Sequence, residues 1–471
     1  MAIVETSGKE MVRWRELIKT GHASALVLVC LGIWLHAADG LLVATMMPAI
    51  VADIGGIGAL PWNIALYEVG SIVSGAASGL LTTRYGVKTP MAVAAFLFSV
   101  GCLVSAFAPS MNVVLAGRLF QGFGGGGMMA MSFVSIATLF PSRLTGRVIA
   151  VISALWGVAS FVGPVLGALF VEYLSWRAGF FAFAGQGIFL AVWIASSSRI
   201  RSTAADTGDN SPFPIRRLLW LTASIVSIAW AGIEVSLLKT TAFVALALLL
   251  LFRFLQLDMA SGNNRLLPRN PVDVRRATNA ALAVVFCFSA ATIAIGLYGP
   301  VLMMAVHGVS ILTAGSVLLC ESIAWSVMAV IVSGISERHD RTMAAIGMCI
   351  VASSIACLAW SIPHGPIWFI FISAILMGSG YGMAWTFILR VATQTADEDD
   401  VSRVSGAMPT IQRLGFAFGA AYLGIVANSS GIAAMGVAGR PEPIAIAVFA
   451  APLLPVMFGL AALYMFARPR E

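Results

Sequence analysis

The sequence predicts an all-α polytopic membrane protein, because it is too apolar and too poor in charge for a soluble fold. Of its 471 residues, 59% are apolar and only 10% are Asp, Glu, Lys or Arg, and the mean hydropathy is +0.93. Soluble proteins carry about 25% charged residues, so this chain cannot cover a water-exposed surface of its size. Fourteen membrane helices of about 20 residues leave about 190 residues for loops and tails. We therefore expect no soluble catalytic domain and no enzyme activity.

Apolar segments follow one another along the chain in groups of six, two and six. The first group is expected near residues 23–50, 60–82, 89–108, 112–140, 146–171 and 178–197. The middle pair, near 218–236 and 241–257, is joined by a tight turn around Lys239 and lies between polar stretches at 198–217 and 258–277. The last group is expected near 278–306, 311–334, 342–361, 365–390, 402–428 and 443–467. The predicted domains are a leader (1–22), a six-helix bundle (23–197), a region of loops with two inserted helices (198–277), a second six-helix bundle (278–467) and a tail (468–471).

Lys and Arg are concentrated in alternate loops. If the N-terminus is cytoplasmic, 22 of the 28 Lys and Arg residues fall on the cytoplasmic side. This asymmetry predicts that both termini are cytoplasmic in a cell inner membrane. The net charge of +7 arises from these short clusters, so we expect lipid contacts and no nucleic-acid binding. The six Cys lie in apolar stretches without CxxC spacing, which indicates free thiols rather than a disulfide framework or a metal site.

The two six-helix groups repeat one another at a constant offset. The chain reads GFGGGGM from Gly122 and GSGYGM from Gly378, 256 residues later, and the same offset aligns Gly163 with Gly419. One offset through two helices and their loop predicts parallel halves with the extra pair inserted between them. Transporters built from such repeats bind substrate near the membrane midplane, between the halves.

Four ionisable side chains are predicted to lie at membrane depth and to take part in proton coupling: Asp39, Glu68, Arg118 and Glu321. The three acids are expected to carry the protons, and Arg118 to release a proton from a nearby acid by stabilising its charged form. A charge at this depth is costly unless it has a partner or lines a cavity, and burial favours the neutral form of a carboxyl group. Glu68 precedes Gly79 by 11 residues and Glu321 precedes Gly334 by 13, which places the two acids at similar depths. The alternatives are carboxyl groups hydrogen-bonded to a neighbouring helix and an Arg118 side chain that reaches the interface. His36 is expected to pack or to face water, and the acidic run 397–400 to be a solvated loop.

Aromatic and amide side chains near these acids suit a flat, amphipathic cation through apolar burial and cation–π contact. The candidates for substrate binding are Tyr67, Gln121, Trp156, Tyr298, Trp325 and Gln412. The alternative for each is packing or anchoring at the interface, as is usual for aromatic residues in membrane helices. Arg413 is expected either to face the cavity or to pair with an acid.

Two glycine-containing motifs complete the candidate residues. In the loop from Gly79 to Lys88, glycines at 79 and 86 would let the helix end and turn, while Arg84 and Lys88 hold the loop in the cytoplasm. In the fifth segment, Pro164 removes a backbone hydrogen bond, and Gly163 and Gly167 permit close contact with a neighbouring helix.

Taken together, these patterns resemble the major facilitator superfamily, and within it the fourteen-helix drug:proton antiporter branch. The 79–88 loop is similar to the family's GxLaDRxGRK loop, Arg118 to Gly122 to its RxxQG motif, and Gly163-Pro164 with Gly167 to its antiporter motif gxxxGPxxGG. Asp39 followed by Pro48, Trp62 with Tyr67, and residues 175–177 are similar to further patterns of this branch. The chain departs from the family at Thr83, which stands where the family's loop has an acidic residue. It also departs from the family's patterns at Leu41, Ala44, Ala159 and Ala168.

This resemblance implies a major facilitator fold of fourteen helices, with two six-helix bundles and an inserted pair. It also implies a proton-coupled secondary transporter that exports toxic or amphipathic small molecules by alternating access. No GxxxxGK[ST] run, the phosphate-binding loop of ATPases, is present, so we expect no cofactor and a proton gradient as the energy source. We expect a monomer as the working unit. The alternatives are a dedicated exporter or importer of one metabolite, such as a sugar, organic acid or siderophore, and a transport-silent membrane sensor.

Overall fold

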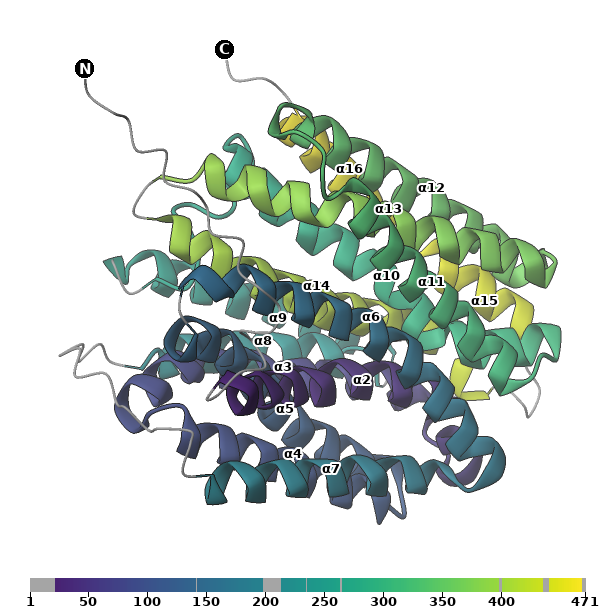
Figure 1. Ribbon diagram of the computed structural model, residues 1–471. Helices are drawn as coiled ribbons and strands as arrows, with labels where there is room; N and C mark the ends of the chain where they lie inside the picture. Colours follow the sequence, from purple (N-terminus) through teal and green to yellow (C-terminus); the bar gives the residue numbers. More distant parts are fainter. Residues whose placement is uncertain are drawn as a thin grey trace, which may run out of the picture.

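The computed structural model describes residues 22–140, 142–197, 213–233, 235–262, 265–397, 400–434 and 440–467. Within these ranges the chain forms long helices that lie side by side, and no strand is present there (Figure 1). The predicted tail and all but the last residue of the predicted leader lie outside the described residues.

The helices agree with the expected segments almost one for one. The first bundle contains α2 (His22–Ile54), α3 (Leu60–Tyr85), α4 (Lys88–Ala106), α5 (Met111–Leu139), α6 (Ser142–Tyr173) and α7 (Trp176–Ser196). The inserted pair is α8 (Ile215–Trp230) and α9 (Leu237–Met259). The second bundle contains α10 (Ala277–His307), α11 (Ile311–Val332), α12 (Asp340–His364), α13 (Ile367–Gln394), α14 (Val401–Ser429), α15 (Pro441–Ala450) and α16 (Leu453–Ala467).

The chain is a multi-pass membrane protein. Its described part contains fourteen successive helical segments when α15 and α16 are taken together, and eleven of these are long and apolar enough to cross a membrane. The other three segments are α3, α5 and α8, which lie among them. Glycines and polar side chains that face neighbouring helices lower the hydropathy of α3 and α5 without shortening them.

Four details of the helices differ from the sequence prediction. The last segment is broken between α15 and α16, where Pro452 has no backbone N–H to continue the helical hydrogen bonds. The turn of the inserted pair lies before Lys239 rather than around it, since Lys239 is already in α9, where its backbone N–H donates to the Ser236 hydroxyl. Gly79 lies inside α3 and does not end it. Asp400 is buried and accepts hydrogen bonds from Arg265 and from a backbone N–H, so it does not belong to a solvated loop.

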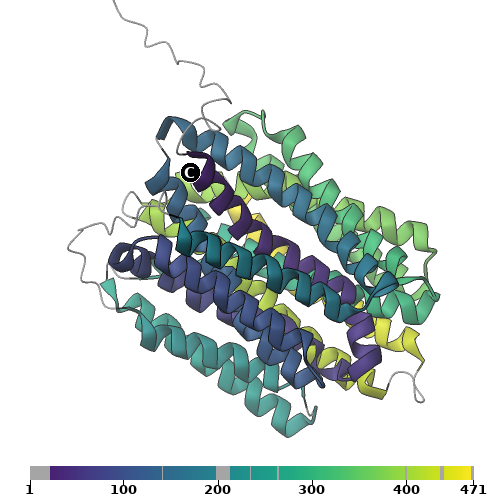
Figure 2. The ribbon, with the colours of Figure 1, turned by 60° about the horizontal axis from the view of Figure 1, so that its bottom comes forward.

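The two bundles lie next to each other and meet mainly along two helix pairs, α6 with α11 and α3 with α14, while α2 also contacts α10 and α11 (Figures 1 and 2). The inserted helix α8 packs against α9, α3 and α14, and the pair lies along one edge of the molecule in Figure 2. Because α2 begins and α16 ends at one end of the bundle, we call this the terminal end and the opposite one the distal end.

Glycines allow equivalent helices to touch in both bundles. Gly122 of α5 lies against the backbone of Tyr67 in α3, and Gly378 of α13 lies in the same way against Glu321 in α11. A Cβ atom at either glycine would overlap a backbone carbonyl of the partner helix. The repeat in the sequence is therefore also a repeat of helix contacts.

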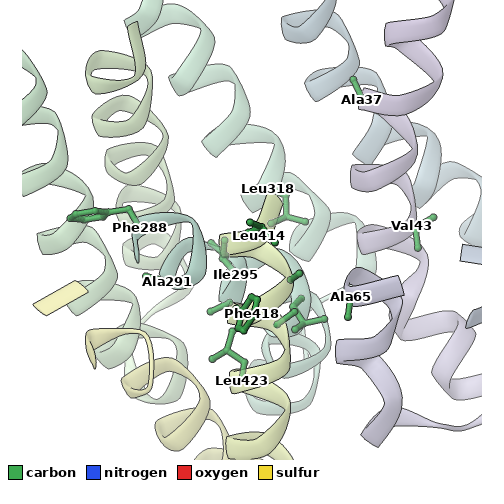
Figure 3. Packing of buried hydrophobic residues seen from close by; sticks show 14 of the residues in the cluster. Ala37, Val43, Ala65, Phe288, Ala291, Ile295, Leu318, Leu414, Phe418 and Leu423 are labelled. Carbon is green, nitrogen blue, oxygen red and sulfur yellow. The ribbon is translucent and has the colours of Figure 1, made fainter. Parts of the chain in front are cut away.

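Large apolar side chains fill the second bundle, whereas small ones face it from the first. In Figure 3, Ile295 of α10 lies near Leu414 and Phe418 of α14, and Ala65 of α3 lies across from them. All four side chains are buried. This packing fixes the position of α14, which carries Arg413 across from the first bundle.

Candidate functional site

A buried ion pair joins α2 to α5. Nη1 of Arg118 lies 2.5 Å from an Asp39 carboxylate oxygen, and the two side chains are 3% and 1% exposed. The same nitrogen donates to the Gln121 side-chain oxygen, and the Gln121 amide donates to the Ser105 hydroxyl at 3.1 Å. Arg118 therefore does not reach the interface, because its charge is satisfied inside the first bundle.

Tyr67 connects this ion pair to His36. The Arg118 guanidinium lies over the Tyr67 ring, 4.2 Å from its centroid, and the Tyr67 hydroxyl is 2.8 Å from Nδ1 of His36. Gly125 leaves room for this contact, since a Cβ there would lie 2.8 Å from the hydroxyl and 3.1 Å from Nδ1. His36 is thus buried and hydrogen-bonded, and does not face water.

Arg413 extends from α14 into the first bundle. It lies 3.1 Å from a Glu68 carboxylate oxygen, 2.8 Å from Nε2 of His36 and 2.9 Å from the sulfur of Met129. A guanidinium can only donate, so Nε2 accepts and His36 is neutral, with its proton on Nδ1 facing Tyr67. Of the two possibilities for Arg413, pairing with an acid is the one realised.

These contacts form one continuous polar network between two ion pairs. It runs from Asp39 through Arg118, Tyr67, His36 and Arg413 to Glu68, and it links four helices, α2, α3, α5 and α14. A proton added to either carboxylate would cancel an ion pair and leave a guanidinium unpaired at membrane depth, which costs several kcal/mol. Protonation of either carboxylate would therefore favour a new position for the guanidinium that had been its partner.

Glu321 does not belong to this network. It lies on α11 with a half-buried side chain, and it has no hydrogen-bond or ion-pair partner among the residues described. Its counterpart in the first bundle is Tyr67, because Gly378 and Gly122 make the same contact with these two residues. Glu68 and Glu321 thus lie at the same depth to within one residue, as expected, but they project from different faces of their helices.

An aromatic stack begins at Trp325 of α11, four residues after Glu321, and continues with two aromatic residues of α13. The Trp325 ring stacks on Tyr381 with centroids 4.7 Å apart, and Tyr381 stacks on Trp385 at 6.3 Å. The Tyr381 hydroxyl contacts Ser289 at 2.9 Å and also Gln412. Tyr381 and Trp385 escaped the sequence analysis, although Tyr381 lies within the repeated glycine segment.

The remaining two candidates for substrate binding, Trp156 and Tyr298, lie in different parts of the molecule. Trp156 of α6 meets His36 edge-on, with centroids 6.3 Å apart, and so borders the network. Tyr298 is fully buried in α10, and its hydroxyl has no hydrogen-bond partner in the described part of the chain. The structure thus brings Tyr67, Gln121 and Trp156 together, and Trp325 with Gln412, but places Tyr298 in the packed core.

Comparison with known proteins identifies the family. The family model described as Major Facilitator Superfamily matches residues 29–420 and, in a second match, 280–471. The chain belongs to the Major Facilitator Superfamily.

Similar members of this superfamily span most of the chain. A "probable multidrug-efflux transporter" of Mycobacterium tuberculosis is 27% identical over 90% of this chain and 91% of its own length. "Multidrug resistance protein 3" of Bacillus subtilis is 26% identical over 78% of this chain and 72% of its own. A solved nucleoside transporter superposes with a TM-score of 0.66 over 95% of this chain and 100% of its own, at 10% identity, which shows the shared fold.

In this major facilitator protein the Gly163-Pro164 motif positions the helix that carries Asp39. Gly163 and Gly167 of α6 lie against the backbone of α2 at Ala38 and Leu42. Pro164 lies buried within α6 between them. The close contact predicted from the two glycines is therefore made with α2, directly beside the ion pair.

The 79–88 motif comprises the end of α3, the short turn at residues 86–87 and the first residue of α4, at the terminal end. Gly86 has φ +70°, which favours glycine, and ends α3. Lys88 donates from Nζ to the Ser197 carbonyl at 2.8 Å, tying the turn to the end of α7, while Arg84 is exposed over the Tyr85 ring. The side chain of Thr83, the position of the family's acid, lies outside the described residues.

Proposed function

We propose that the protein is a proton-coupled antiporter that exports toxic, amphipathic or cationic small molecules by alternating access. The observation that carries this proposal is the network that joins the Asp39–Arg118 pair to the Glu68–Arg413 pair between the halves. The relatives named for multidrug efflux and resistance, which match over most of the chain, support the same function.

Protonation supplies a simple route for coupling. A proton on Asp39 removes the negative partner of Arg118, whose guanidinium then needs another acceptor at membrane depth. Tyr67 contacts both Arg118 and His36, so such a shift is transmitted toward Arg413 and the second bundle. Substrate and protons would use this network in turn as it opens to each side.

The distribution of charge supports the orientation and the energy source. The excess of Lys and Arg at the terminal end supports a cytoplasmic position for that end, with the helices crossing the inner membrane. The proton gradient would drive export without a cofactor, and the monomer would be the working unit, because each half supplies its own part of the network. Asp39 and Glu68, with Glu321 as a separate acid, are the proposed proton carriers. Arg118 is proposed to help release the proton of Asp39 by stabilising the charged carboxylate.

The test is drug-driven proton release from liposomes that contain the purified protein and a pH-sensitive dye. Ethidium and other organic cations, then neutral and anionic compounds, are added under an imposed proton gradient. Wild-type protein should release protons with several unrelated cations, and Asp39→Asn and Arg118→Ala should not. Asp53→Asn, which changes an exposed carboxylate paired with Arg177 near the distal end of α2, is the matched control and should behave as wild type.

Each other outcome has a definite meaning. Normal coupling in folded Asp39→Asn and Arg118→Ala would exclude the assigned proton route. A response to a single compound would favour a dedicated exporter, and silence of folded wild-type protein with every compound would exclude antiport.

A further inference from the structure

Arg413 is a basic side chain that the second bundle places inside the polar network of the first. Its three contacts, Glu68, His36 and Met129, come from α3, α2 and α5, and its side chain is only 14% exposed. The Glu68 side chain is 11% exposed, so this carboxylate is largely withdrawn from water. The ion pair therefore spans the boundary between the halves where α3 meets α14.

The fold does not require this ion pair. The residue of the first bundle that corresponds to Arg413, 256 positions earlier, is Gly157 of α6. Because Gly122 contacts Tyr67 and Gly378 contacts Glu321, the next residues along these helices also correspond, Glu68 of α3 and Ser322 of α11. At this second boundary, where α6 meets α11, a Cβ added to Gly157 would meet the Ser326 side chain at 3.3 Å. Glycine and serine are thus enough to pack α6 against α11. The presence of two charged side chains at the boundary of α3 with α14 must therefore have a cause other than packing.

The surroundings of Arg413 are those that an organic cation needs. They offer a carboxylate, the accepting nitrogen of a neutral imidazole, and a polarisable thioether. The Trp156 ring lies edge-on to that imidazole at 6.3 Å. A guanidinium is itself planar, delocalised and weakly hydrated, and it resembles a flat organic cation more than an ammonium does.

We infer that Arg413 is a tethered competitor of the cationic substrate: it occupies Glu68 while the site is empty, and a monovalent organic cation replaces it there. The inference rests on the proposed export of cations and names the carboxylate that recognises them. Replacement removes the ion pair that joins α3 to α14, so substrate binding also releases a contact between the halves. A neutral compound cannot replace a guanidinium at a carboxylate and would leave this contact in place.

Binding of tetraphenylphosphonium to the purified full-length protein tests the inference at mildly alkaline pH. Removing the competitor in Arg413→Ala should tighten cation binding about tenfold, which corresponds to about 1.4 kcal/mol. Arg413→Lys, which keeps a cation, should remain close to wild type. Glu68→Gln should weaken binding, and adding it to Arg413→Ala should cancel the gain. Arg253→Ala is the matched control, since it removes an exposed arginine from α9.

Unchanged or weaker tetraphenylphosphonium binding by folded Arg413→Ala would overturn the inference, as would equal tightening for a neutral aromatic probe. Arg413→Gln provides a second variant if the alanine protein unfolds; it removes the charge but keeps a donor, and it too should tighten cation binding. If wild-type protein performs cation-driven proton release but no variant tightens, only the role of Arg413 is wrong. If wild-type protein releases no protons with any cation, the proposed function itself fails.

Discussion

His36 determines how the two ion pairs are connected at the scale of single residues. It accepts at Nε2 from Arg413, so Nδ1 must carry the proton that faces Tyr67. A second proton on this ring would leave the Arg413 guanidinium facing a donor. The neutral imidazole therefore belongs to the same arrangement as the two ionised carboxylates, and the network changes as a unit.

The Asp39–Arg118 pair should behave as a coupled pair in stability. Asp39→Asn and Arg118→Gln should each lower the free energy of unfolding by about 3 kcal/mol, because each leaves one charge buried without its partner. The double variant should lose clearly less than the sum of the two single losses. Thermal unfolding in detergent measures all three, and additive losses would show that the two side chains do not depend on each other.

At the scale of helices, glycine spacing brings the site residues to their positions. Gly122 permits α5 to approach α3 at Tyr67, and Gly163 permits α6 to approach α2 beside Asp39. Such contacts replace side-chain packing by close backbone approach, which is how membrane helices associate without a hydrophobic driving force. The distances within the network depend on these approaches.

Filling one of these contacts should therefore disturb the site without touching a charged residue. Gly122→Ala places a methyl group against the Tyr67 carbonyl, and Gly378→Ala does the same at Glu321. We expect each to lower the free energy of unfolding by about 1–3 kcal/mol, and Gly122→Ala also to weaken proton coupling. Gly79→Ala in α3 is the control, since nothing lies within 4 Å of a Cβ there. Equal stability of all three variants would contradict this role of close contact.

At the scale of the whole molecule, the inserted pair joins both halves at the distal end. The Asn428 amide of α14 donates to the carbonyl of Gly58, just before α3, at 2.9 Å and to that of Gly232, just after α8, at 2.5 Å. Trp62 of α3 meets Trp230 of α8 edge-on at 5.7 Å. The inserted pair thus stabilises the contact of α3 with α14 at this end.

Loss of this distal contact should shift the protein toward opening at that end. Asn428→Leu removes both hydrogen bonds, and we expect the distance between spin labels at positions 172 and 442 to lengthen on average. Both positions are exposed near the distal ends of α6 and α15, in opposite halves. Ser429→Ala, the neighbouring exposed residue, should leave the distance distribution unchanged. Identical distributions for the two variants would mean that Asn428 does not hold the halves together.

The sequence by itself determined the order and the approximate limits of the helical segments, and the repeat. Bilayer thickness imposes the length and hydropathy of each segment, and those properties are local. The tertiary structure decided the partners: Asp39 meets Arg118, 79 positions away, and Glu68 meets Arg413, 345 positions away, while Glu321 meets neither. These pairings depend on which helices are adjacent and how each is rotated about its axis, and a rotation of one residue separates Glu68 from the face that matches Glu321.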